Sequence, residues 1–223
     1  MASSLTPSLA PATTATSYTL PPTGLSEPTR IEPANALPSG NQPSFAYPPL
    51  YNFPPFYTLQ PNTTTRQAQL QAWSGLIQSY CKYHRTWRLS LVDAIDTPLF
   101  RNDALNRRLS LADAQTVLDW MANKDAGGGG GRAEWISTKD KSLAWIYWRR
   151  PEEWAELIAG WVDDTGQKNT VLTFYELMEG EMTTSQEFHG MDPDLFQKSL
   201  NLLVKRGRAQ VFGSEDQQGV KFF

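Results

Sequence analysis

Two near-identical tetrapeptides are the residues of this chain best suited to specific binding chemistry. They are Pro48-Pro49-Leu50-Tyr51 and Pro54-Pro55-Phe56-Tyr57, with Phe53 between them. Each pair of prolines fixes φ near the polyproline II value and removes backbone donors, which predicts an extended segment. Aromatic side chains on a stiff segment offer a large contact area and lose little entropy on docking. The repeat therefore predicts a protein-binding segment.

We expect nine residues of this segment to bind other proteins, because no neighbouring sequence offers them a core. The nine are Pro48, Pro49, Leu50, Tyr51, Phe53, Pro54, Pro55, Phe56 and Tyr57. One alternative is a proline-rich linker whose aromatic side chains pack back on their own domain. Another is an adaptor whose Pro-Pro-x-Tyr motifs recruit ubiquitin ligases with WW domains. The motif alone does not separate these readings.

The residue types that most often carry catalysis form no recognisable arrangement here. The only histidines are His84 and His189, and the only cysteine is Cys81. His84 lies on the apolar stripe of a predicted helix, and His189 follows Glu187 in a turn without a nearby nucleophile. No G-x-S-x-G, phosphate-loop or H-E-x-x-H spacing occurs. We expect no enzyme activity, no catalytic residue, and no metal or cofactor site.

Composition narrows the classes of partner. The formal net charge is −3, which argues against broad binding to nucleic acid or to an anionic membrane. Cys81 has no disulfide partner and lies at a helical position, which favours a buried thiol in a reducing compartment. No apolar run is long enough to cross a bilayer, so we expect no membrane span.

The beginning of the chain differs in composition from the rest. Thirteen of the 16 prolines lie at or before Pro61, together with only three charged residues, Glu27, Arg30 and Glu32. Such a segment cannot bury enough apolar surface to fold, and it lacks the basic start and apolar core of a signal peptide. We expect a disordered tail rich in Pro, Ser and Thr at residues 1–44 and an extended binding segment at residues 45–61.

Apolar spacing and helix caps predict the elements that follow. Residues 66–85 are typical of an amphipathic helix, Ser90 and Ser110 cap two more, and residues 133–136 and 142–148 are typical of a hairpin. Residues 127–131 are five consecutive glycines. They predict a flexible inserted loop without defined contacts, and they lack the lysine of a phosphate loop.

The same order of elements returns in the second half. Pro151 begins a helix that Gly166 ends, Thr173 and Asp192 cap the next two, and residues 209–212 and 220–223 form a second hairpin. Residues 89–93 match residues 172–176 in pattern, which a single α+β domain would not explain. We therefore predict an α+β, mainly α fold of two tandem winged helices, at residues 62–150 and 151–223.

Five blocks of sequence carry a recognisable family pattern. They are residues 53–62, 148–154, 175–177, 187–191 and 219–223. Over roughly residues 48–223 the chain resembles the vacuolar protein sorting protein 25 family, the small two-winged-helix subunit of the ESCRT-II complex. The tail and the glycine run depart from the family pattern.

The resemblance implies a non-enzymatic cytoplasmic scaffold that reaches the endosomal membrane indirectly, through its complex. It implies that the nine proline–aromatic residues dock on vacuolar protein sorting proteins 22 and 36. It also implies that the second winged helix binds the ESCRT-III subunit vacuolar protein sorting protein 20, in the sorting of ubiquitinated membrane proteins into multivesicular bodies. For that contact we expect Thr173, Glu176, Glu179 and Glu181 by their position in residues 172–181, and the three carboxylates among them suit a basic partner helix.

Winged helices also bind DNA, with the third helix in the major groove. In the first winged helix that helix carries Asp113 and Asp119, which would repel phosphate. The second offers only a basic cluster at Lys198, Lys205, Arg206 and Arg208. We therefore expect no nucleic-acid partner, and a DNA-binding winged helix is the least favoured alternative.

Overall fold

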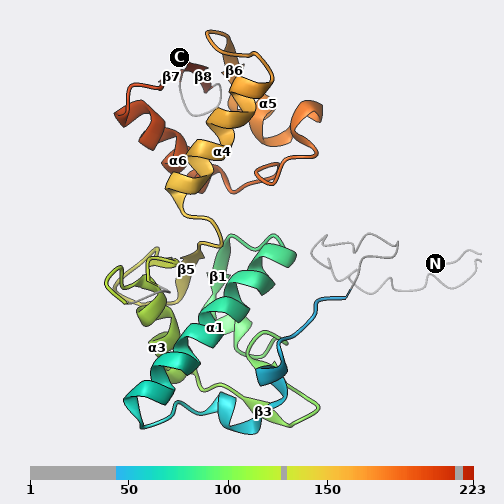
Figure 1. Cartoon of the computed structure of the whole chain (residues 1–223), viewed down its shortest axis with the longest axis vertical. Coiled ribbons are helices and arrows are strands. Elements are labelled where there is room, and N and C mark those ends of the chain that lie inside the picture. Colours follow the sequence, from blue (N-terminus) through green and yellow to red (C-terminus); the bar gives the residue numbers. More distant parts are fainter. Residues whose placement is uncertain (1–43, 127–129, 214–217) are drawn as a thin grey trace, which may run out of the picture. The chain divides into compact units, whose positions relative to one another are not determined.

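Among the described residues, the first half of the chain has short 3-10 turns followed by a winged helix (Figure 1). The computed structural model describes residues 44–126, 130–213 and 218–223, so the predicted tail lies outside the described residues except for Ser44. The elements of this half are η1 (Pro49–Asn52), η2 (Pro54–Tyr57), α1 (Thr63–Tyr83), β1 (Arg88–Ser90), α2 (Leu91–Ala94), β2 (Arg101–Asn102), β3 (Arg107–Arg108), α3 (Leu111–Ala122), β4 (Ala133–Trp135) and β5 (Leu143–Ile146).

Helix α1 begins earlier than the predicted residue 66. The side chain of Asn62 accepts a hydrogen bond from the Thr65 backbone N–H at 3.1 Å, which satisfies one of the free donors at the helix start. The helix ends at Tyr83, with His84 as its C-cap. The caps predicted at Ser90, Ser110, Thr173 and Asp192 are confirmed, since each of these side chains accepts a hydrogen bond from a backbone N–H in the first turn of its helix.

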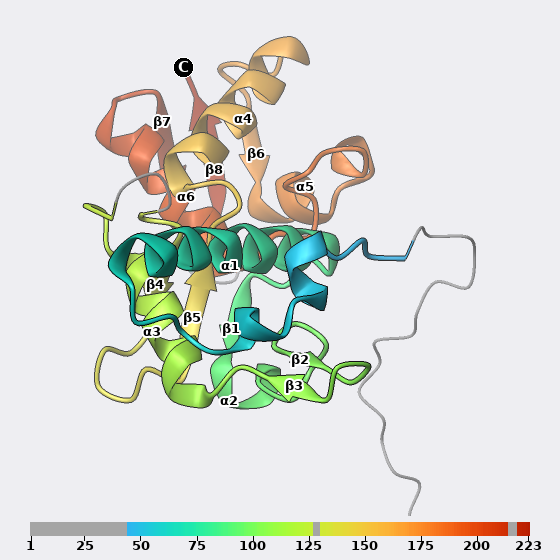
Figure 2. The ribbon, with the colours of Figure 1, turned by 60° about the horizontal axis from the view of Figure 1, so that its bottom comes forward.

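The first sheet has the antiparallel strand order β1-β5-β4, and helices α1 and α3 pack against it (Figure 2). Leu89 pairs with Ala144, and Ala133 pairs with Ile146. These four residues are buried in the first core. The short ribbon of β2 and β3 was not expected from the sequence, and it lies where the chain passes the 3-10 turns.

The second half repeats this arrangement. Its elements are α4 (Pro151–Asp164), β6 (Val171–Thr173), α5 (Phe174–Glu179), η3 (Glu181–Thr183), α6 (Pro193–Lys205), β7 (Ala209–Phe212) and β8 (Gly219–Phe222). The strand order is β6-β8-β7, so the last strand again lies in the middle of its sheet. Helix α4 packs along α6 (Figure 1).

Glycines end α4 and α6 as predicted. Gly166 and Gly207 have φ values of +67° and +69°, a left-handed conformation that glycine adopts without strain. After α4, the Gln167 N–H donates to the Val162 carbonyl at 3.0 Å and closes the last turn. The chemistry of the helix ends was therefore readable in the sequence.

The fold class is confirmed as α+β, mainly α, with two tandem winged helices. Residues 62–150 and 151–223 remain our proposal for the limits of the two domains. The two cores meet across this boundary, because three aromatic residues of the first half pack in the second core: Trp87, Trp145 and Tyr147.

Charged contacts also join the halves. Arg88 on β1 contacts Asp192 and Asp194 at the start of α6, at 2.7 Å and 2.5 Å. Glu187 accepts contacts from Lys82 at 3.1 Å and from Arg149 at 2.8 Å. These pairs link α1, β1 and the segment before α4 to the second winged helix.

Part of the glycine run makes a defined contact, contrary to the prediction. Gly127 to Gly129 lie outside the described residues. Gly130 is buried, and its carbonyl accepts a hydrogen bond from the Arg150 guanidinium at 2.9 Å. The loop therefore touches the start of α4 through its backbone rather than through side chains.

Candidate protein-binding sites

The proline–aromatic segment, residues 45–61, is divided between a buried and an exposed side. Tyr51, Phe56 and Tyr57 are only 8%, 3% and 3% exposed and belong to the first core. The prediction that these aromatic side chains have no core to enter is wrong. The segment is also not fully extended, because each Pro-Pro pair starts a 3-10 turn. For these three side chains, the alternative of packing on their own domain is what the structure shows.

Hydrogen bonds of the tyrosine hydroxyls explain why these polar groups can be buried. The Tyr51 hydroxyl lies 2.7 Å from the carbonyl oxygens of both Pro98 and Arg101 and donates its proton between them. The Tyr57 hydroxyl donates to the Tyr51 carbonyl at 2.9 Å. Burial raises the pKa of Tyr51, and the neighbouring Tyr57 raises it further. Both tyrosines are therefore neutral and fully engaged inside the domain.

Two amide side chains that the sequence analysis missed hold the segment in place. The Gln69 amide donates to the carbonyls of Phe56 at 2.8 Å and Thr58 at 3.0 Å. The Asn102 amide donates to the Tyr51 carbonyl at 3.0 Å. A glutamine one turn before Trp73, on the apolar side of a predicted helix, was the available signal, because a buried amide requires partners.

The other residues of the segment form an apolar surface. Leu50 and Phe53 are 45% and 54% exposed, and Pro49, Pro54 and Pro55 are also exposed. We call these five residues the exposed proline–aromatic face. Pro48 is half-buried. Because the buried residues fix the backbone, the exposed ones are presented with little loss of conformational freedom on docking.

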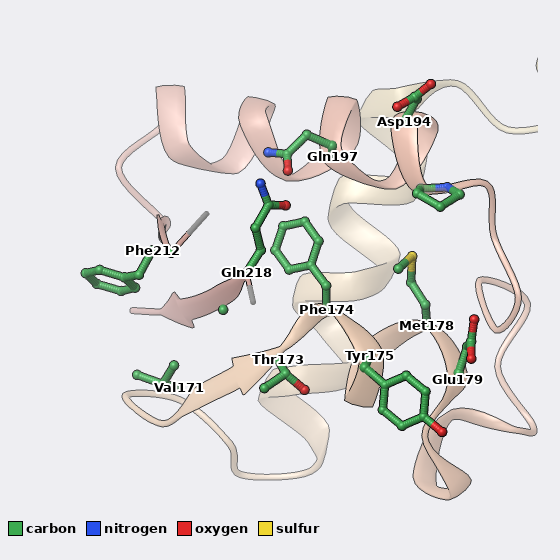
Figure 3. Close-up of a pocket in the computed structure, with 13 residues that line it drawn as sticks. Val171, Thr173, Phe174, Tyr175, Met178, Glu179, Asp194, Gln197, Phe212 and Gln218 are labelled. Atoms are coloured by element: carbon green, nitrogen blue, oxygen red, sulfur yellow. The ribbon is translucent and has the colours of Figure 1, made fainter. Parts of the chain in front are cut away.

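A groove opens on the second winged helix between its sheet, helix α5 and the first turns of α6 (Figure 3). Its volume is about 1150 Å³. We call it the second groove, and it is lined by Val171, Thr173, Phe174, Tyr175, Met178, Glu179, Pro193, Asp194, Gln197, Phe212, Gly213, Gln218 and Gly219. Figure 3 shows that the labelled residues come from both sides of the groove, with Gln197 of α6 across from Phe174 and with the ring of Tyr175 pointing away from α6.

The four residues predicted to meet ESCRT-III are all exposed, but only two of them line this groove, Thr173 and Glu179. Thr173 and Glu176 form a capping box, since the Glu176 carboxylate accepts from the Thr173 N–H at 2.7 Å. That bond, with the Thr173 hydroxyl, lowers the pKa of Glu176. Glu181 lies beyond the groove in η3.

The apolar members of the groove were not singled out from the sequence. Tyr175 is 67% exposed, and Val171 and Phe212 are also exposed. Exposed apolar side chains gathered around a concave surface mark an interaction site more often than single exposed ones do. The available signal was the alternation of Val171 and Thr173 on a strand whose other face is buried.

The two histidines lie in different surroundings. His84 is exposed at the end of α1, so the prediction that it lies on the core stripe is wrong. The Nδ1 atom of His189 lies 3.0 Å from the Thr183 hydroxyl inside a turn. Within the described part of the chain, no group of His, Cys, Asp or Glu could hold a metal ion, and no helix could cross a membrane.

Three of the four basic residues predicted around α6 are paired with acidic side chains, and the fourth, Lys205, is exposed without an ion pair among the described residues. Arg206 and Arg208 contact the Glu156 carboxylate at 2.5 Å and 2.8 Å. Lys198 pairs with Glu134 of β4. Such pairing removes much of the positive potential that phosphate contacts need.

These observations define a class. The chain is a tandem winged-helix protein with an apolar segment displayed on the first domain and a groove on the second.

Comparison with known proteins identifies the family. A family model described as "ESCRT-II complex subunit" matches residues 50–192. The vacuolar protein-sorting-associated protein 25 of Xenopus laevis is 44% identical over 179 residues, which cover 80% of this chain and 99% of the frog protein. The human protein of the same name is 44% identical over 180 residues, covering 81% of this chain and 98% of the human protein.

Solved structures point to the same family. A crystal structure of subunit VPS25 of the endosomal trafficking complex ESCRT-II superposes with a TM-score of 0.68 and 32% identity, covering 79% of this chain and 98% of that one. A chain in the crystal structure of the endosomal complex ESCRT-II (VPS22/VPS25/VPS36) superposes with a TM-score of 0.67 and is 32% identical in sequence. The match covers 78% of this chain and 98% of that chain. The chain belongs to the vacuolar protein-sorting-associated protein 25 family of ESCRT-II subunits.

Proposed function

We propose that this chain is a non-enzymatic scaffold that links the core of ESCRT-II to ESCRT-III. In this proposal the exposed proline–aromatic face docks on vacuolar protein sorting proteins 22 and 36. The second groove binds the ESCRT-III subunit vacuolar protein sorting protein 20. The protein would work in the cytoplasm at endosomal membranes, reached through its complex, in sorting ubiquitinated membrane proteins into multivesicular bodies.

The observation that carries the proposal is the two-sided arrangement of the proline–aromatic segment. Tyr51, Phe56 and Tyr57 fix the segment to its own core, and Leu50 and Phe53 point out of it. Apolar side chains held on a fixed backbone are typical of binding hot spots. One of the similar solved structures is a complex of VPS25 with VPS22 and VPS36, which supports the choice of these partners.

The chemistry of the second groove supports the proposed link to ESCRT-III. The exposed side chains of Val171, Tyr175 and Phe212 suit the apolar face of an amphipathic helix. Glu179 on the same groove has no ion-pair partner among the described residues, and it suits a basic residue beside that face.

The competing readings gain no support. A WW domain would have to reach the tyrosines of the two motifs, and both are buried with their hydroxyls bonded inside the first domain. A DNA-binding role would need several free basic residues at α6, whereas Lys198 and Arg206 are paired with carboxylates and Lys205 alone of the predicted cluster has no ion pair among the described residues.

Co-purification with the two proposed core partners tests the proposal. The chain would be co-expressed with vacuolar protein sorting proteins 22 and 36, as the wild type and as the double variant Leu50→Asp, Phe53→Asp. We expect the wild type to enter a stable complex and the double variant to be lost from it, because each aspartate would be buried without a partner. Val92→Asp is the matched control, since Val92 is 60% exposed and lies on α2 outside the segment. Retention of the double variant would contradict the proposal.

A further inference from the structure

Gly219 occupies a distinctive place in the second groove. It begins the middle strand β8 and pairs with Thr173 of β6 on one side and Phe212 of β7 on the other. All three residues line the groove. Gly219 therefore lies between Thr173 and Phe212 in the sheet and has no side chain, whereas both neighbours have one.

The backbone conformation does not require a glycine at this position. Gly219 is not among the residues with positive φ, so an L-amino acid could adopt its backbone angles. A Cβ atom there would lie 3.1 Å from Cγ1 of Val171 and 3.4 Å from the Leu172 carbonyl oxygen. The first contact is tight, but Val171 is exposed and can move slightly. Gly219 is buried at the start of its strand, and a strand glycine without a special φ can mark a place where a ligand or another backbone approaches closely, as it can mark a bulge or a bend.

The first winged helix shows the same position with a side chain. There the Leu91 N–H donates to the Ser142 carbonyl at 2.8 Å, just as the Phe174 N–H donates to the Gln218 carbonyl at 2.9 Å. The next residue of the middle strand is Leu143 in the first domain, paired with Ser90, and Gly219 in the second. The two domains thus share these hydrogen bonds and this strand pairing. They differ at one position of the middle strand, which is Leu143 in the first domain and Gly219 in the second.

We propose that Gly219 is the specificity-determining residue of the second groove. Its missing side chain lets an amphipathic helix of the ESCRT-III partner come close to the sheet, between Phe212 and Tyr175. The helix directs apolar residues to those side chains and a basic residue to Glu179. Leu143 obstructs the corresponding approach in the first winged helix, which makes the second domain the docking domain. The inference rests on the proposed link to ESCRT-III.

The test is the variant Gly219→Leu in the full chain, which places the side chain of the first domain in the second groove. The N-terminal half of vacuolar protein sorting protein 20 would be titrated against the wild type, Gly219→Leu and Gly219→Ala. We expect at least a tenfold rise in Kd for leucine and a smaller rise for alanine. Gly75→Leu is the matched control, because Gly75 is exposed on α1 and a Cβ atom there would have no neighbour within 4 Å, so its Kd should be unchanged.

The outcomes distinguish a failure of the inference about Gly219 from a failure of the proposed link to ESCRT-III. If Gly219→Leu binds as tightly as the wild type and melts cooperatively, the inference about Gly219 is wrong and the ESCRT-III link stands. If the wild type does not bind the segment, the proposed link is wrong and the inference fails with it. If Gly219→Leu does not fold, Gly219→Ala decides, and an unchanged Kd for alanine would overturn the inference.

Discussion

The indole ring of Trp73 lies parallel to the ring of Phe56, with the ring centroids 4.2 Å apart and the planes within 6°. The indole N–H also donates to the Phe56 carbonyl at 3.1 Å. Trp73 thus holds the proline–aromatic segment by its ring and by a hydrogen bond. Trp73 lies on α1, so the segment folds back onto the helix that follows it in the sequence.

Replacing Trp73 by alanine should therefore destabilise the first domain and release the segment. We expect a loss of about 3–5 kcal/mol in the free energy of unfolding, as for other buried aromatic residues. Trp154→Ala is the matched comparison, because Trp154 is equally buried in the second core and should show a similar loss. Limited proteolysis within the segment should accelerate for Trp73→Ala only. Equal protection of the segment in both variants would show that Trp73 does not hold it.

Glu187 should make the stability of the chain depend on pH. Burial alone would raise the pKa of Glu187, but the hydrogen bonds and charges of Arg149 and Lys82 outweigh it, so the pKa lies below its ordinary value of 4.5. A lowered carboxyl pKa contributes stability above pH 4.5, and this contribution is lost as the pH falls through the folded-state pKa.

The variant Glu187→Gln tests this, with a loss of about 1 kcal/mol at neutral pH, since Lys82 is exposed and its pair is screened. Denaturant unfolding should show the two proteins converging in acid. Glu181→Gln is the control in the same segment and should behave as the wild type. A constant difference between Glu187→Gln and the wild type down to acid pH would contradict this assignment.

Cys81 should be unreactive in the native protein. Its side chain is buried, and burial raises the pKa of the thiol to about 12. Since the thiolate is the nucleophile, a thiol reagent at pH 8 should label Cys81 only after the protein unfolds. Rapid labelling of a chain that still melts cooperatively would show that the first core opens around α1.

In the proposed contact with ESCRT-III, Glu179 should make binding depend on salt. The Glu179→Gln variant removes one charge from the groove without changing its shape, so we expect Kd to rise a few-fold at low salt and to vary less with salt than for the wild type. Glu181→Gln is the comparison outside the groove and should change Kd less. A larger effect at Glu181 would place the acidic contact on η3 instead.

The elements of the fold were predictable because their signals are local. The caps at Ser110 and Thr173 and the glycines at Gly166 and Gly207 each act within one turn of helix. Because these signals occur in the same order in both halves, they predicted two tandem winged helices. The family resemblance, also visible in the sequence, is confirmed by the comparisons.

The division of the proline–aromatic segment was not predictable in the same way. The Tyr51 hydroxyl bonds to Pro98 and Arg101, about 50 residues away in sequence. No local pattern announces such a partner, and an apolar residue that enters its own core looks the same in sequence as one that binds another protein. The second groove was missed for a related reason, because it joins residues that lie far apart in the sequence, from Val171 to Gly219.

The central claim is that neighbouring residues of the segment have separate tasks, so the most direct test measures stability and binding together in two variants. Phe56→Ala should lower the melting temperature, and Phe53→Ala should leave it nearly unchanged, since Phe56 is buried and Phe53 is 54% exposed. Calorimetric titration into a complex of vacuolar protein sorting proteins 22 and 36 should show at least a tenfold higher Kd for Phe53→Ala. Unchanged binding by Phe53→Ala, with the loss confined to Phe56→Ala and following its instability, would contradict the account.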